Sequence, residues 1–191
     1  MGQIICNNMV ENGIPLEKML FKFGNLVPDL LVTYIFNKHS QSRCSSRLKK
    51  LLKRVYKASH SNRWIFSYYS GVASHYICDF LCYAHTSVFS GSLRDHLTYE
   101  KNQPFIDTDV LPFHKLDSMY YSLTELDNAL DELISKRVQL LSKNAWMSVS
   151  DIPVAIRVAS WAAIAAYFHL KISPHHGQSI SFYTHEHRQT A

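Results

Sequence analysis

Residues 75–85 read HYICDFLCYAH and residues 96–100 read HLTYE, and together they hold five side chains of types that bind metal ions. These are His75, Asp79, His85, His96 and Glu100. In two pairs, His75 with Asp79 and His96 with Glu100, the residues are four positions apart. This spacing stacks both side chains on one face of a helix. Imidazole and carboxylate ligands presented in this way suit zinc or a similar divalent ion, so the stretch predicts a metal centre built on helices.

His85 follows Asp79 by six residues, which is about 240° further round an ideal helix. It cannot share the face of His75 and Asp79 unless the helix breaks or bends. We therefore expect His85 to bind a neighbouring ion, together with His96 and Glu100 as a three-ligand site.

The pair His75 and Asp79 needs further ligands, because a zinc site takes three or four from the protein. Two candidates lie upstream: Asp29, which follows Pro28, and His39. Taken alone, each would be an ordinary solvated side chain of a loop. A zinc site at His75 and Asp79 still lacks two ligands, which favours Asp29 and His39 in that role.

Helical periodicity runs through most of the chain, which has only 6 Gly and 6 Pro among 191 residues. The pattern predicts a single all-α domain over residues 1–172, a bundle of about six or seven helices with a metal cleft between helices. We expect residues 173–191 to form a polar, His-rich C-terminal tail. The first helix should end at Gly24, before a turn over Asn25–Asp29. The expected helices are Pro15–Phe23, Ser45–Ala58, Arg63–Ala84, Ser92–Lys101, Lys115–Asn144 and Ser150–Ile172.

The chain is mildly basic, with a formal charge of +5, which favours anionic partners such as phosphate groups or anionic lipid surfaces. Much of the excess lies in Arg43–Lys57, which by itself is typical of a solvated helix face. Nucleic acid is not an expected partner, because further basic clusters with interleaved aromatic residues are missing. The apolar run Val154–Leu170 contains Arg157 and is too short to span a bilayer, so we expect a buried helix and no transmembrane segment.

The cysteines Cys6, Cys44, Cys78 and Cys82 form no zinc-finger or redox motif. We expect free, buried thiols; the alternative is that a thiolate of Cys78 or Cys82 joins the metal ligands. The N-terminus lacks the basic and apolar regions of a secretory signal, so the expected location is cytoplasmic.

The order PD, H, GxxxHxxxDxxxxxH and HxxxE, which falls within Gly24–Lys101, resembles the bacterial zinc-dependent phospholipase C family. It is also similar in layout to the related single-strand-specific zinc nucleases. The matching residues are Pro28, Asp29, His39, Gly71, His75, Asp79, His85, His96 and Glu100.

This resemblance implies an all-α fold and a zinc hydrolase of phosphoester bonds that uses a metal-activated water. The resemblance also implies a phospholipid head group as the substrate and peripheral contact with a membrane. It implies that Asp29 is the catalytic residue, which would orient or deprotonate the water. In the family a third zinc ion uses an N-terminal Trp and an early His; here the first Trp is Trp64 and the first His is His39, so we expect two ions. One would be held by Asp29, His39, His75 and Asp79, and the other by His85, His96 and Glu100.

Three alternatives remain open at this point. The protein could be a metal-stabilised helical binding or structural protein, with closed four-ligand sites that contribute folding energy. It could instead be a nuclease-like phosphodiesterase. Finally, the His and Asp residues could be ordinary helix residues without a metal.

Overall fold

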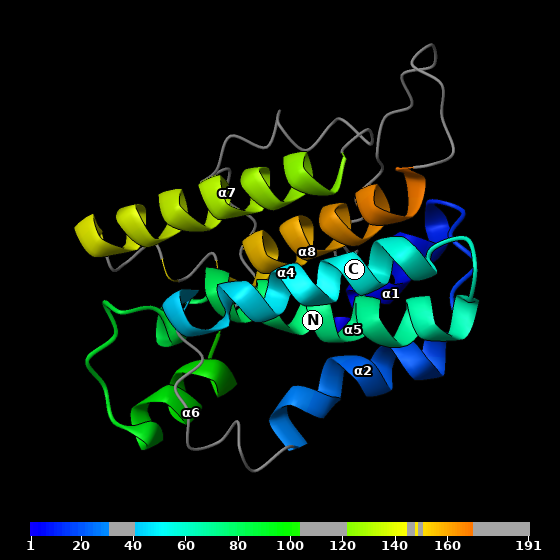
Figure 1. Ribbon diagram of the computed structural model, residues 1–191. Coiled ribbons are helices and arrows are strands. Elements are labelled where there is room, and N and C mark those ends of the chain that lie inside the picture. The colour runs from blue at the N-terminus through cyan, green and yellow to red at the C-terminus, as the bar shows by residue number, and fades with distance from the viewer. Residues whose placement is uncertain (31–40, 104–121, 145–147, 149–150, 170–191) are drawn as a thin grey trace, which may run out of the picture.

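The computed structural model describes residues 1–30, 41–103, 122–144, 148 and 151–169, without the side chains of residues 41–45 (Figure 1). In these ranges all regular secondary structure is helical, which confirms the expected all-α class. The α-helices are α1 Gly2–Glu11, α2 Lys18–Leu30, α4 Gln41–Ala58, α5 Arg63–Leu81, α6 Leu93–Lys101, α7 Leu123–Lys143 and α8 Asp151–Phe168, and Tyr83–His85 form a short 3₁₀-helix, η1.

Helices α5 and α8 form the centre of the fold, and α1, α2, α4 and α7 pack around them. Helix α8 is apolar on all sides, and its buried residues include Trp161 and a run of alanines. Within the described ranges it is the one helix long and apolar enough to cross a membrane by length and composition, and 83% of it is buried inside the protein. The prediction of a buried helix is therefore confirmed.

Two glycines allow α2 and α5 to approach each other closely. A Cβ on Gly24 of α2 would overlap the carbonyl oxygen of Tyr68 in α5, and a Cβ on Gly71 of α5 would lie 2.8 Å from the backbone nitrogen of Asn25. The predicted helix end at Gly24 and the predicted turn over Asn25–Asp29 are wrong, because α2 continues through both to Leu30. Gly24 serves helix packing, and Pro28 lies inside α2 without ending it, although its ring nitrogen cannot donate a hydrogen bond to the carbonyl of Gly24.

The N-terminal helix α1 was not expected from the sequence. Its first residue has no side-chain cap, so the usual start signal is missing. Its buried residues Ile5, Cys6 and Met9 belong to the main hydrophobic core, and α1 packs mainly on α8. Tertiary burial, rather than local signals, therefore accounts for this helix.

Helix α6 begins where the sequence predicts it. The Ser92 side chain accepts a hydrogen bond from the Asp95 backbone, and the Asp95 carboxylate accepts one from the Ser92 backbone. This capping box fixes the first turn of α6, and with it the orientation of the residues that follow.

Replacing Gly71 with Ala should destabilise the fold, although alanine favours helix formation. The new methyl group would press on the backbone of α2 at Phe21 and Asn25, and backbone can move only with the whole helix. We expect the free energy of unfolding to fall by about 1–3 kcal/mol, measured by urea denaturation. The control is Gly2→Ala in α1, where the methyl group meets only the rotatable Asn25 side chain and the change should stay within about 0.5 kcal/mol. Equal stability of Gly71→Ala and the wild type would contradict the close packing.

Candidate metal centre

Six of the seven predicted ligands lie in one continuous row that crosses α2, α5, η1 and α6. The seventh, His39, lies outside the described residues. Neighbouring side chains in the row alternate between carboxylate and imidazole. The members, in spatial order, are Asp29, His75, Asp79, His85, Glu100 and His96.

The first half of the row joins the end of α2 to the middle of α5. His75 Nε2 lies 3.5 Å from Asp29 Oδ1 and 3.1 Å from Asp79 Oδ2. His75 and Asp79 are nearly buried, with 11% and 10% of their side chains exposed, whereas Asp29 is 66% exposed. This half of the row is therefore nearly buried at His75 and Asp79 and open to solvent at Asp29.

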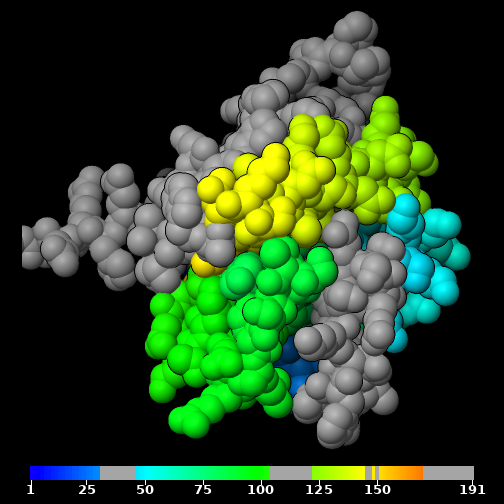
Figure 2. Space-filling view, turned by 90° about the vertical axis from the view of Figure 1, so that its left-hand side faces the viewer, coloured from blue at the N-terminus to red at the C-terminus, as the bar shows by residue number. Residues whose placement is uncertain are grey.

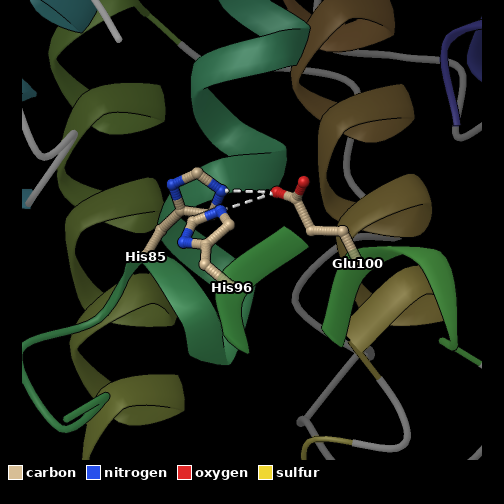
Figure 3. A group of neighbouring side chains, drawn as sticks. All are labelled: His85, His96 and Glu100. Carbon is tan, nitrogen blue, oxygen red and sulfur yellow. Dashed lines mark hydrogen bonds and ion pairs between the residues drawn. The ribbon is translucent and has the colours of Figure 1, made fainter. Parts of the chain in front are cut away.

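The second half forms the tightest group of potential ligands within the described part of the chain (Figure 3). Donor atoms of His85, His96 and Glu100 all lie within 4.8 Å of one another. Glu100 Oε1 is 3.1 Å from His85 Nε2 and 2.9 Å from His96 Nε2, and the sticks converge on this oxygen. The two imidazole rings meet edge to face, with centroids 4.5 Å apart.

The donor set of this second half fits a zinc ion. Zinc takes nitrogen and oxygen ligands at about 2.1 Å, which places tetrahedral ligands about 3.4 Å from each other. The two N–O separations of 2.9 and 3.1 Å at Glu100 need only a small expansion to reach that value. Because Glu100 is 47% exposed, a fourth position could remain open to water, as in catalytic zinc sites.

Asp79 connects the two halves. Its Oδ2 faces His75, and its Oδ1 lies 3.7 Å from Nε2 of His85. On a continuous helix Asp79 and His85 would lie on different faces, so this contact requires a break in the helix between them. The helix does break: α5 ends at Leu81 rather than at the expected Ala84, and the extended backbone at Cys82 lets η1 turn back.

The break in α5 is held by two side chains from the far end of the sequence. Arg137 of α7 donates from Nε to the carbonyl of Leu81 at 3.4 Å. The backbone N–H of Tyr83 donates to Asp151 Oδ2 at 2.6 Å. Arg137 and Asp151 pair with each other at 2.5 Å and are fully buried. These bonds occupy backbone groups that a continuous helix would have used itself.

Asp151 also holds α6 in place. The hydroxyl of Tyr99 donates to Asp151 Oδ2, and Tyr99 directly precedes the ligand candidate Glu100. Burial, followed by the nearby Asp151, raises the pKa of the Tyr99 hydroxyl, which therefore stays protonated as a donor. One buried carboxylate thus contacts both segments that carry the second half of the row.

In the metal-free protein, contacts within the row favour the charged forms of Glu100, His75 and His85. Hydrogen bonds from His85 and His96 lower the pKa of Glu100 to about 2. Burial acts to lower the pKa of His75 and of His85, but the neighbouring carboxylates outweigh it, and both values lie above the ordinary one. Asp79 contributes to the increase at both histidines. The imidazoles are therefore held by the carboxylates before any metal binds.

The cysteines of α5 take no part in the row. Cys78 and Cys82 are buried free thiols, and Cys78 Sγ donates to the carbonyl of Ala155 in α8, at 3.8 Å. Burial raises the pKa of Cys78 to about 12 and that of Cys82 well above its usual value, so neither is a thiolate at neutral pH. The expectation of free, buried thiols is confirmed for these two and for Cys6, while the side chain of Cys44 lies outside the description.

Fold and site together define an all-α protein with a row of histidine and carboxylate ligands that suits zinc. A family model described as zinc-dependent phospholipase C matches residues 1–144, well over half of the chain. This chain belongs to the zinc-dependent phospholipase C family. No curated protein and no solved structure gave a significant match.

The buried pair of Arg137 and Asp151 should be costly to break. Arg137→Met leaves the Asp151 charge buried without its partner, so we expect the free energy of unfolding to fall by about 3–5 kcal/mol. The matched control is Lys136→Met, which removes the exposed ion pair with Glu132 and should cost less than about 1 kcal/mol. Denaturant unfolding of both variants measures the difference, and similar losses for the two would contradict the role of the pair.

Metal removal should expose a pH dependence of stability. His75 and His85 have raised pKa values in the metal-free fold, so protonating them stabilises this fold below their unfolded pKa, and the benefit is lost as the pH rises through the folded values. We expect the melting temperature with EDTA to fall between about pH 6 and pH 8. Zinc affinity should rise over the same range, because protons compete with the metal for imidazole.

Differential scanning fluorimetry with EDTA and with zinc, across this pH range, measures both effects. The variant His75→Gln/His85→Gln serves as the reference, because it lacks the two titrating groups. A metal-free melting temperature with the same pH dependence in the wild type and in this variant would contradict the assignment.

Proposed function

We propose that this protein is a zinc-dependent hydrolase that cleaves the head-group phosphoester of phospholipids, in the manner of a phospholipase C. Membership of the zinc-dependent phospholipase C family supports this activity at the level of the family. The single observation that carries the proposal for this chain is the alternating row from Asp29 to His96, partly buried and open along one side.

The residues of the row would hold two ions, with Asp79 between them. His85, His96 and Glu100 would hold one ion, and His75, Asp79 and Asp29, with His39 as the further expected ligand, would hold the other. Zinc bound there would lower the pKa of a water molecule and draw charge from phosphate oxygens. The nearly buried imidazoles of His75 and His85 close the row on the protein side, so a substrate would approach from the side of Asp29 and Glu100.

Asp29 is the residue we assign to proton transfer. It lies at the edge of the row, and its exposed carboxylate approaches the row through Oδ1, 3.5 Å from His75. This position lets it contact a water molecule on the open side, where it would orient the water or accept its proton. Figure 2 shows the blue end of α2, which carries Asp29, recessed beside the green residues of η1 and α6.

Hydrolysis of phospholipid vesicles by the zinc-loaded protein tests this function, with the released phosphorylated head group as the readout. Asp29→Asn should lower kcat by about 100-fold or more and leave the zinc bound at His85, His96 and Glu100 in place. His96→Ala should abolish activity and remove about one zinc ion per chain. The control His60→Ala alters an exposed histidine between α4 and α5 and should change neither quantity.

The alternatives give different results in the same experiment. Zinc binding with no cleavage of phospholipids, other phosphodiesters or single-stranded nucleic acid would make the protein a metal-stabilised structural or binding protein. Cleavage of single-stranded nucleic acid alone would identify a nuclease. Zinc content unaffected by His96→Ala would contradict the site assigned to His85, His96 and Glu100.

A further inference from the structure

The outer face of α2 is an exposed apolar stripe. Met19, Phe23, Leu26 and Leu30 are spaced by four, three and four residues, which places them on one side of the helix, and all four are exposed. The opposite side, with Phe21, Gly24 and Pro28, is buried against α5. Helix α2 therefore presents large apolar side chains to the solvent on the side opposite its buried residues.

A second pair of exposed apolar side chains borders the row from the other side. Leu93 and Leu97 of α6 are both exposed. On an ideal helix they share an arc of about 100° with His96 and Glu100. Asp29 sits at the end of α2, one residue from Leu30. The candidate metal centre is thus flanked on two helices by exposed apolar residues, and each of these helices supplies ligands.

Basic side chains accompany the apolar ones. Lys18 is exposed and Lys22 half-buried on α2, and Asp29 is the only acidic residue of that helix. The stripe also connects to the basic helix α4 through aromatic contacts on α5. Phe23 packs on Tyr68, Tyr68 on Tyr69, and the guanidinium of Arg54 lies 5.0 Å from the Tyr69 ring centroid.

We propose that this surface, made of the α2 stripe with Leu93 and Leu97, docks on an anionic phospholipid bilayer and brings the metal centre to the head groups. The proposal rests on the proposed phospholipid substrate. An apolar helix face bordered by lysines is the pattern of helices that lie in the membrane interface. The apolar side chains enter the head-group region, and Lys18 and Lys22 of α2 lie beside the anionic lipid.

Vesicle co-sedimentation tests the docking surface separately from catalysis. The assay uses the Asp29→Asn protein, so that lipid turnover does not alter the vesicles, which are either pure phosphatidylcholine or a mixture with phosphatidylglycerol. The added change Phe23→Gln/Leu26→Gln should weaken binding to the mixed vesicles by at least about tenfold. The change Lys18→Gln/Lys22→Gln should reduce the preference for anionic vesicles.

The matched control is Lys136→Gln/Lys143→Gln, which removes two lysines from α7 on the opposite side of the fold (Figure 1) and should leave vesicle binding unchanged. In the otherwise wild-type protein, Phe23→Gln/Leu26→Gln should leave hydrolysis of a monomeric short-chain phospholipid unchanged and slow hydrolysis of vesicles. Loss of both activities would implicate the metal centre instead.

The proposal is overturned if the protein does not bind mixed vesicles, or if the stripe variant binds them as well as its parent. It is also overturned if sedimentation shows a dimer that Phe23→Gln/Leu26→Gln converts to a monomer, because the stripe would then be covered by a second copy of the chain.

Discussion

The buried pair of Arg137 and Asp151 is the interaction on which the geometry of the candidate metal centre depends. Removing two charges from water costs several kcal/mol per ion, and the protein offsets this cost with hydrogen bonds that all end near the site. Arg137 reaches the Leu81 carbonyl, and Asp151 accepts from Tyr83 and Tyr99. The pair therefore ends α5 at Leu81 and holds α6 beside it, which brings candidate ligands from separate segments together.

The row itself is assembled from helix packing on one side and a helix break on the other. The close approach at Gly24 and Gly71 brings the end of α2 to His75, whereas the turn at Cys82 brings His85 back towards Asp79. Alternating imidazoles and carboxylates lie within ion-pair distance of one another before an ion arrives. Because little rearrangement is needed on binding, more of the binding energy is retained as affinity.

The sequence predicted the helical class, and it predicted two neighbouring sets of candidate ligands because one-turn spacing on a helix is a local property. The structure brings six of these seven candidates together in one row. It could not place the end of α5, since Asp151 lies 68 residues from Tyr83 and no local signal marks the break. Gly24 was misread as a helix end because a glycine that permits close helix packing has the same local pattern. The number of metal ions, the role of His39 and the cellular location stay predictions.

Asp151 lies beyond residue 144, where the match to the family model ends. A part of the chain chosen by that match would keep all seven ligand candidates, yet it would lack the carboxylate that fixes η1 and α6. It would also lack α8, on which α1 and α5 pack. The contacts that position the candidate ligands therefore extend into α8, beyond the part of the chain that the family model matches.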